Sequence, residues 1–216
     1  MIQDYLTRDI PSLGFALPGP VLSRFWKMIA HYHGGIFNAS KIGQSMDISH
    51  NTVRKYLDIL EQTFMVRLLQ PLEINLKKRL VKSPKIYLRD SGLLHTLLEI
   101  DSATELYGHP VFGASWEGWC IEQIIATLPF WQPFFYRKSS GEEIDLVLVK
   151  GKKRLIFEIK ASLTPHLSKG FADTMKALTP ERVWVVCPMT DSGYPIQSDG
   201  RVTGISECLG DLAVYE

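Results

Sequence analysis

GEEIDLVLVKGKKRLIFEIK, residues 141–160, decides the fold of the second half of this chain, because two apolar runs flank a turn that contains glycine. Runs of Ile, Leu, Val and Phe this short predict two adjacent strands that are buried on both faces. A two-residue loop at Gly151-Lys152 would make them an antiparallel hairpin and place Asp145 opposite Glu158. Lys160 lies two residues beyond Glu158 and therefore on the same face. A loop shifted by one residue would place Asp145 opposite Lys160 instead, and the same three groups would still share one face.

Ionisable side chains in such an apolar hairpin point to chemistry. Two carboxylates side by side repel each other, and a hard divalent cation such as Mg²⁺ or Mn²⁺ relieves that repulsion. Asp145 and Glu158 are therefore candidate metal ligands, and Lys160 could hold an attacking water or stabilise negative charge on a phosphate. A structural pair of Glu158 and Lys160, with Asp145 at an exposed strand end, is the alternative that spacing alone leaves open.

The residues around this hairpin predict a mixed α/β unit. VFGASWEGWCIEQIIATL, residues 111–128, has the pattern of a helix, with Glu117 near its start. Its tryptophans, Trp116 and Trp119, are expected in the core. The predicted strands are 134–138, 143–149, 155–161 and 182–187, and a short closing strand and helix are predicted within 194–216.

The first half of the chain predicts a winged helix. Residues 40–46 and 50–64 each have a helical apolar pattern, and Ser40 and Ser49 are expected to cap these helices. A short helix, a tight turn and a longer helix with polar and basic residues near its start form a helix-turn-helix, whose second helix can enter a major groove. A further helix is predicted at 21–32, and strands at 66–72 and 85–88 would form the hairpin, or wing.

Positive charge is concentrated in the predicted wing. From Lys77 to Arg89 the sequence has six basic residues and no acidic residue. A solvated face and a protein-docking surface are the alternatives to a phosphate-binding edge, but the adjacent helix-turn-helix favours DNA contact. The candidate DNA-binding residues are Asn51, Arg54 and Lys55 in the helix and Lys77, Lys78, Arg79, Lys82 and Lys85 in the wing.

Length and composition bound the class of protein. The chain has 216 residues, 45% of them hydrophobic and 22% charged, which is typical of a folded globular protein. Residues 1–105 carry 13 Lys and Arg against 10 Asp and Glu, and residues 106–216 carry 11 against 13. We therefore expect a winged-helix domain and a separate mixed-sheet domain, with no sheet crossing from one to the other. Three widely spaced cysteines, no apolar run long enough to span a membrane and no secretory signal predict a cytoplasmic protein.

The second half resembles the PD-(D/E)XK nuclease-like superfamily. The resemblance rests on Asp145 followed after twelve residues by Glu158-Ile159-Lys160, within an αβββαβ order over residues 111–188. It implies that Asp145 and Glu158 bind the metal, that Lys160 is the catalytic lysine and that Glu117 is an accessory catalytic acid.

The first half is similar to the region that precedes such a domain in the uncharacterised C-terminal part of predicted bacterial and archaeal AAA-type ATPases. The segments that carry this resemblance are YLTRDI (5–10), NASKIG (38–43), NTVRKYLDILEQTFMVRLL (51–69) and KSPKIYLRDSGLL (82–94). It implies an AAA-type ATPase domain N-terminal to this region in full-length relatives. Two features depart from the pattern: Ile144 stands where the motif's name has proline, and no P-loop, GxxxxGK[ST], occurs in the sequence. ATP hydrolysis by that route is therefore not expected from this chain, which is either a fragment of a longer protein or a naturally shortened relative.

Three functions follow as hypotheses. The first is Mg²⁺-dependent phosphodiester hydrolysis, with the winged helix delivering DNA to the second domain. The second is a catalytically inactive nucleic-acid-binding or partner-docking module of the ATPase. The third, a winged-helix transcriptional regulator, leaves the buried acidic residues unexplained.

Overall fold

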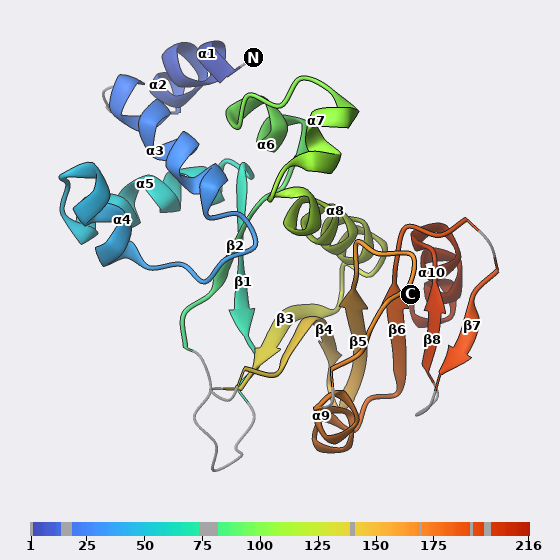
Figure 1. Ribbon diagram of the computed structural model, residues 1–216. Coiled ribbons are helices and arrows are strands. Elements are labelled where there is room, and N and C mark those ends of the chain that lie inside the picture. The colour runs from blue at the N-terminus through green and yellow to red at the C-terminus, as the bar shows by residue number, and fades with distance from the viewer. Residues whose placement is uncertain are drawn as a thin grey trace.

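The computed structural model describes residues 2–13, 19–73, 82–138, 141–168, 170–190, 192–196 and 200–216 and has a mixed α/β fold (Figure 1). Its strands are β1 (Val66–Pro71), β2 (Lys85–Leu88), β3 (Gln132–Arg137), β4 (Glu143–Lys150), β5 (Lys153–Ile159), β6 (Arg182–Val186), β7 (Tyr194–Ile196) and β8 (Gly200–Thr203). They form one eight-stranded sheet in the order β2-β1-β3-β4-β5-β6-β8-β7. The β1–β3, β5–β6 and β6–β8 pairs are parallel and the other neighbours are antiparallel, so the expected mixed sheet is confirmed.

Helices precede the sheet in the first half of the chain. They are α1 (Ile2–Asp4), the π-helical η1 (Tyr5–Asp9), α2 (Ile10–Ser12), α3 (Gly19–His31), α4 (Ala39–Met46) and α5 (His50–Gln62). The order α3-α4-α5-β1-β2 is the order expected for three helices followed by a wing. Within the ranges that the structure describes, no helix has the length and apolar character needed to cross a membrane.

The ends of α4 and α5 show where local sequence signals were sufficient. Ser49 caps α5 as predicted, because its Oγ accepts the backbone N–H of Thr52 at 3.1 Å. The Ser40 cap is wrong: Asn38 is the extended residue before α4, and its Oδ1 accepts the backbone N–H of Lys41 at 3.0 Å. The second helix also ends before residue 64, since Phe64 has a left-handed backbone and an exposed ring.

The wing strands join the second half of the chain. β1 pairs with β2 in an antiparallel register from Val66 opposite Leu88, and then with β3 in parallel through Gln70 opposite Phe134. The expectation that no sheet would cross between the two halves is therefore wrong. The physical reason is that β1 and β3 each have an open edge, whose backbone N–H and C=O groups are satisfied by pairing.

After the hairpin, the chain continues through α6 (Ser91–Leu97), α7 (Ala103–Gly108) and α8 (Phe112–Thr127). α7 spans the point at which the two halves were expected to separate, and Ser102 caps it by accepting the backbone N–H of Glu105 at 3.2 Å. α8 agrees with the predicted helix to within one residue at each end. The connection is thus a folded segment that leads directly into the longest helix of the second half.

The β4–β5 hairpin has the register that a two-residue loop requires. Lys150 pairs with Lys153 across Gly151 and Lys152, and the ladder continues as far as Leu146 opposite Phe157. Gly151 has φ +62°, in the left-handed region that glycine adopts without steric cost. Of the two loops that the sequence left open, the one at Gly151-Lys152 is therefore confirmed.

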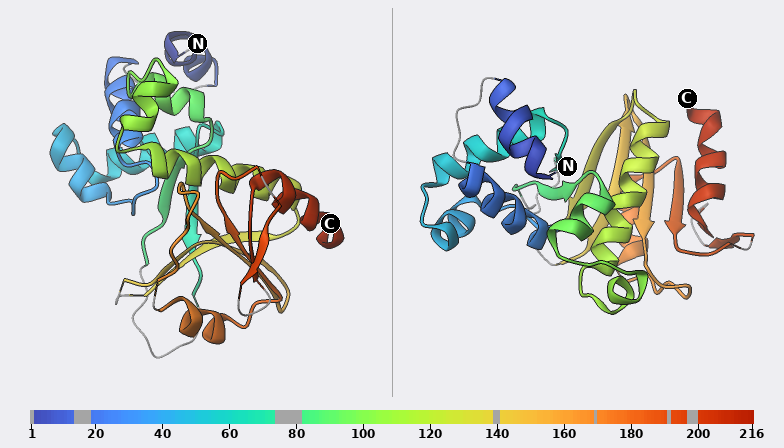
Figure 2. Two further views of the ribbon diagram at one scale, coloured as in Figure 1. Left: turned by 45° about the vertical axis from the view of Figure 1, so that its right-hand side comes forward. Right: turned by 90° about the horizontal axis from the view of Figure 1, so that it is seen from above.

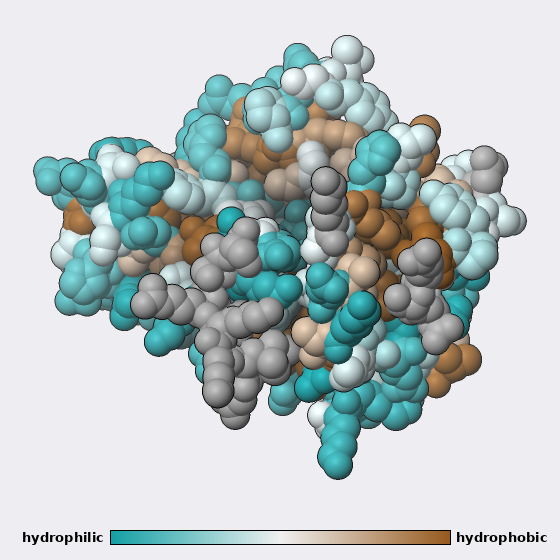
Figure 3. Space-filling view, turned by 60° about the horizontal axis from the view of Figure 1, so that its bottom comes forward, coloured by the Kyte–Doolittle hydropathy of each residue, from teal (hydrophilic) through white to brown (hydrophobic). Residues whose placement is uncertain are grey.

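Helices cover both faces of this sheet (Figure 2). α8 and α10 (Ile205–Leu212) pack on one face, where the apolar residues Ile121, Ile124 and Leu212 join Leu146 and Phe157 in one core. α9 (Phe171–Leu178) covers the other face with a smaller core. A 3₁₀ turn, η2 (Ala213–Tyr215), follows α10. The space-filling view shows hydrophilic residues over much of one face, with hydrophobic residues in patches between them (Figure 3).

His33, just after α3, connects three elements. Its Nδ1 accepts the backbone N–H of Leu88 at 3.0 Å, so Nε2 carries the proton and donates to the carbonyl oxygen of Ala114 on α8 at 3.0 Å. Burial lowers the pKa of His33 to about 4. Gly118 of α8 permits this approach, because a Cβ at that position would lie 2.7 Å from Nε2 of His33.

Candidate active site

The acidic pair lies where β4 and β5 stop pairing. The last ladder pair is Leu146 opposite Phe157, which are the neighbours of Asp145 and Glu158 in the chain, and the register between β3 and β4 also shifts here. Such a bulge re-aims side chains. Asp145 Oδ2 accepts the backbone N–H of Ile159 at 2.8 Å. A side-chain hydrogen bond thus connects β4 to β5 just beyond their last backbone pair. Asp145 is 8% exposed and Glu158 7%, which makes both carboxylates part of the interior.

Asp145 and Glu158, together with Glu117 and Glu143, form an acidic cluster. Lys85, the first residue of β2, brings a positive charge into this acidic cluster. Its side chain is 5% exposed, and its Nζ lies 2.9 Å from Oε1 of Glu117 and 3.9 Å from Oδ1 of Asp145. Oε1 of Glu143 is also in direct contact with the ammonium. A buried ammonium is stable only with such partners. The assignment of Lys85 to a phosphate-binding surface is therefore corrected: in this structure the ammonium faces the interior and is already paired.

Helix α8 supplies further acidic groups that hold the wing hairpin. Oε1 of Glu117 accepts the hydroxyl of Tyr87 as well as the ammonium of Lys85. Further along α8, Oε2 of Glu122 accepts Nη2 of Arg67 at 3.0 Å and Nε of Arg89 at 2.9 Å. Charged hydrogen bonds thus connect both strands of the hairpin to α8. The basic residues Arg67, Lys85 and Arg89 pair with acidic residues of this helix.

Glu158 and Lys160 form the pair that the sequence left open as a structural alternative. Nζ of Lys160 donates to Oε1 of Glu158 at 2.6 Å. Oε2 of Glu158 is buried and has no hydrogen-bond partner among the residues that the structure describes. The side chain of Lys160 is 33% exposed, so part of it faces solvent. Oε2 of Glu158 is therefore available as an acceptor, and the partly exposed Lys160 is available as a donor.

Burial and like charges shift the pKa values of the cluster. Burial raises the pKa of Asp145 well above its ordinary value, and Glu117 and Glu158 raise it further against the opposing charge of Lys85. Burial likewise raises the pKa of Glu158, while Lys160 lowers it. Burial alone would lower the pKa of Lys85, but the neighbouring carboxylates outweigh it and the pKa lies above the usual value. These directions show that the acidic groups would be stabilised by additional positive charge.

The oxygen atoms of the cluster suit a hard divalent cation. Mg²⁺ and Mn²⁺ prefer carboxylate oxygens, and Oε2 of Glu158 is a buried acceptor that lacks a partner within the described part of the chain. Oδ1 of Asp145 has Lys85 at 3.9 Å as its cationic neighbour. No three His, Cys, Asp or Glu side chains in the described ranges are arranged to hold an ion together. An ion here would therefore take one or two carboxylates and complete its shell with water or substrate oxygens, as Mg²⁺ commonly does.

The other predicted DNA-binding residues are not part of the acidic cluster. Asn51, Arg54 and Lys55 are exposed in the first two turns of α5, and Lys82 is exposed just before β2. Lys77, Lys78 and Arg79 lie outside the described residues. The structure therefore places four of the eight candidates on the surface and one, Lys85, in the interior.

Glu143 and Tyr87 belong to the cluster but were missed by the sequence reasoning. Alternation along β4 could have identified Glu143, because it lies two residues before Asp145. Alternation along β2 likewise relates Tyr87 to Lys85, although nothing in the sequence indicates that this strand packs beside α8. Nothing in the sequence indicated that Lys85 is buried, although every residue of β2 is buried in the structure.

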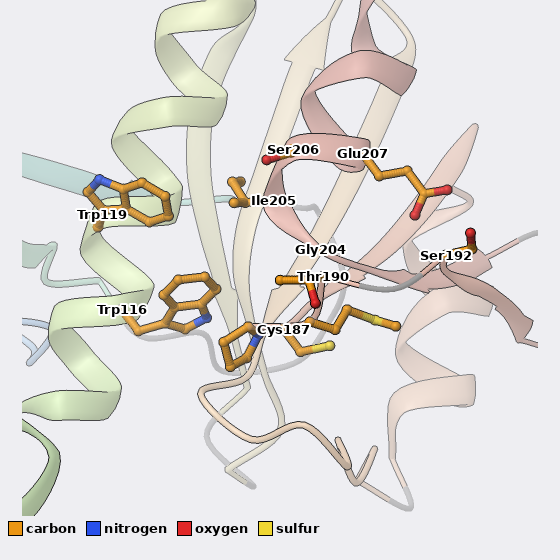
Figure 4. Close-up of a pocket in the computed structure, with 11 residues that line it drawn as sticks. Trp116, Trp119, Cys187, Thr190, Ser192, Gly204, Ile205, Ser206 and Glu207 are labelled. Carbon is orange, nitrogen blue, oxygen red and sulfur yellow. The ribbon is translucent and has the colours of Figure 1, made fainter.

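A separate pocket of about 530 Å³ lies beside α8 (Figure 4). Trp116 and Trp119 line it from α8, and the segments after β6 and β8 supply residues that include Cys187 and Ile205. Trp119 is partly exposed, so the expectation that it lies in the core is wrong. None of the acidic-cluster residues is among those that line this pocket.

Two family models match this chain. Residues 1–104 match one described as Domain of unknown function (DUF8612), and residues 112–208 match one described as Domain of unknown function (DUF4143). The Lys85–Glu117 contact therefore joins residues that belong to different family matches.

Curated relatives extend beyond this chain. Uncharacterized protein Rv2008c of Mycobacterium tuberculosis and Uncharacterized protein Mb2031c of Mycobacterium bovis are each 39% identical to it over 187 residues. The match covers 87% of this chain and 42% of each relative. The chain thus spans less than half the length of these relatives.

Two solved structures show a weak likeness. One is the crystal structure of transcriptional regulator PA3341, with a TM-score of 0.28 and 18% identity over 59% of this chain and 88% of that one. The other is protein VC1899 from Vibrio cholerae, with a TM-score of 0.28 and 11% identity over 99% of this chain and 53% of that one. Both TM-scores lie well below the range that indicates a shared fold.

Proposed function

We propose that this chain is the DNA-binding, PD-(D/E)XK nuclease-like part of an AAA-type ATPase and that its acidic cluster supports Mg²⁺-dependent phosphodiester hydrolysis. One observation carries the proposal: Asp145 and Glu158 are both buried just beyond the end of the β4–β5 ladder, burial and the charge of Glu158 raise the pKa of Asp145, and Lys160 is bonded to Glu158 at 2.6 Å. Buried carboxylates with raised pKa values are typical of catalytic and metal-binding sites.

Each residue has a role that its surroundings support. Asp145 and Glu158 would hold the divalent ion, which when bound supplies positive charge for the phosphate and favours ionisation of water. Lys160 is partly exposed and would donate a hydrogen bond to a phosphate oxygen or position the attacking water. Glu117 touches Lys85 and Tyr87, so we assign it to positioning within the cluster.

The DNA-binding part of the proposal rests on the first half of the chain. Asn51, Arg54 and Lys55 are exposed at the start of the second helix of a helix-turn-helix, where side chains can reach base edges and phosphates. Residues 112–208 match a domain that is typically associated with AAA-type ATPases, and the chain covers 42% of its curated relatives, which leaves room for an ATPase domain in those longer proteins.

A catalytically inactive nucleic-acid-binding module is the second candidate. The observation that favours it is Lys85, whose ammonium already neutralises part of the cluster that a metal would need. Cleavage separates the two candidates, because both predict DNA binding and only one predicts hydrolysis.

The test is a cleavage assay on single-stranded, duplex and branched DNA with Mg²⁺ or Mn²⁺. The wild type should cleave at least one of these substrates, and both Asp145→Asn and Lys160→Ala should abolish cleavage. Asp173→Asn, which changes an exposed acid on α9, is the matched control and should retain activity. Absence of metal-dependent cleavage in the wild type, with DNA binding intact, would favour the inactive module.

A further inference from the structure

Lys85 differs from an ordinary surface lysine in its burial and in its partners. Its side chain is almost completely buried, and three carboxylates from two other elements, α8 and β4, surround its ammonium. Nζ also lies 5.8 Å from the centroid of the Phe135 ring and 5.9 Å from that of Tyr87. The folded protein thus brings a cation from the wing into the acidic centre of the nuclease-like half.

We propose that Lys85 is a built-in counter-cation that competes with a divalent metal ion for Asp145 and its neighbouring carboxylates. The inference rests on the proposed metal site and adds a regulatory element to it. With the lysine in place the cluster is stable without metal, and a metal ion binds fully only when the ammonium moves away from Asp145.

The geometry places the two cations in competition for Asp145. Oδ2 of Asp145 is engaged by the backbone N–H of Ile159, so Oδ1 is the oxygen left for a metal. That same oxygen has Nζ of Lys85 at 3.9 Å. A divalent ion bound to Oδ1 would lie within a few ångströms of the ammonium in a site with little water to screen the repulsion. The repulsion lowers metal affinity for as long as Lys85 stays in the cluster.

The position of Lys85 connects this competition to the wing. Lys85 is the first residue of edge strand β2, three residues after the exposed Lys82. Glu117 and Glu143 would still hold the ammonium if it withdrew only from Asp145, so a small side-chain movement is sufficient. Metal binding therefore depends on the position of the Lys85 ammonium, and thus on the conformation of the chain at the start of β2.

The test is calorimetric titration of Mn²⁺ into the whole chain without DNA. Lys85→Met keeps the apolar stem and removes the charge, and it should bind Mn²⁺ at least tenfold more tightly than the wild type. Lys85→Arg keeps the charge and should retain weak binding. Lys153→Met is the matched control, because it removes an exposed lysine that pairs with Glu181 at 3.1 Å, and its Mn²⁺ affinity should equal that of the wild type.

Folding of the Lys85 variant is controlled separately. Lys85→Met leaves buried carboxylates without their counter-ion, so its melting temperature should fall in EDTA and recover in Mn²⁺. If that variant does not fold, Lys85→Met combined with Glu143→Gln removes one charge of each sign and should bind Mn²⁺ at least tenfold more tightly than Glu143→Gln alone. Equal or weaker binding after removal of Lys85 would overturn the proposal. If Lys85→Met binds Mn²⁺ more tightly than the wild type but neither protein cleaves DNA, the competition is supported and the proposed hydrolysis is refuted.

Discussion

Nζ of Lys85 lies 2.9 Å from Oε1 of Glu117, and this contact joins β2, the edge strand of the hairpin in the first half of the chain, to α8 in the second half. It lies beside a parallel pairing of β1 with β3, so backbone and side chains both cross the boundary between the two halves. A change in the wing therefore acts on the acidic cluster directly, through residues that are in contact.

Replacing Glu117 with Gln should destabilise the fold. The substitution keeps the size of the side chain but removes one of the carboxylates that neutralise the buried ammonium of Lys85, while Glu143 and Asp145 remain. We expect the free energy of unfolding to fall by about 1–3 kcal/mol, below the usual loss for a buried pair that is broken completely. Urea unfolding measures the change. Glu99→Gln, at an exposed pair with Lys27, should leave the urea midpoint where it is in the wild type.

His33 should make stability depend on pH between about 4 and 6.5. Burial lowers its pKa to about 4 in the folded protein, so below pH 6.5 the unfolded chain takes up a proton that the folded protein does not. The contribution of His33 is complete above pH 6.5 and is lost as the pH falls to about 4, with a total of about 3 kcal/mol.

The measurement is urea unfolding of the wild type and of His33→Gln across that range. The comparison isolates His33, because the acidic cluster titrates in both proteins. The wild type should lose more stability on acidification than the variant does, although the variant starts lower through its altered contacts with Leu88 and Ala114. Parallel pH profiles for the two proteins would contradict the prediction.

The sequence was sufficient where a pattern is local. The loop at Gly151 and Lys152 fixes the β4–β5 register, and Ser49 caps α5, because each depends on residues a few positions apart. The pairing of β1 with β3 and the burial of Lys85 depend on how distant segments pack, and a basic residue in a basic stretch gives no sign that it points inward. The candidate carboxylates were found because acids are conspicuous in an apolar hairpin, whereas the lysine that neutralises them comes from another part of the chain.

Gly118→Ala should destabilise the contact between His33 and α8. The new Cβ would lie 2.7 Å from Nε2 and 2.9 Å from Cε1 of His33, closer than van der Waals contact allows. The buried ring has to move and its hydrogen bond to Ala114 has to lengthen, so we expect a loss of about 1–3 kcal/mol in the free energy of unfolding. Gly113→Ala is the matched control on the same helix: a Cβ there has no atom within 4 Å, and alanine should be neutral or stabilise the helix by up to about 1 kcal/mol.

Neutralising four basic residues of the predicted wing should weaken the salt dependence of duplex DNA binding. If Lys77, Lys78, Arg79 and Lys82 each approach a phosphate, replacing all four with Ala should flatten the slope of log affinity against log salt by about 0.9 for each phosphate that is no longer neutralised. Lys85→Ala should leave the slope unchanged, because its ammonium faces Glu117 in the interior.

Fluorescence anisotropy at several salt concentrations, without divalent metal, measures these slopes. The control replaces Lys152, Lys153 and Lys176, which are exposed in the second half of the chain, and should behave as the wild type. An unchanged slope in the four-residue variant would show that the wing does not bind the phosphate backbone. A slope that flattens by about 0.9 in Lys85→Ala alone would show that this lysine leaves the acidic cluster when DNA binds, because only a lysine paired with a phosphate releases a counter-ion from the duplex.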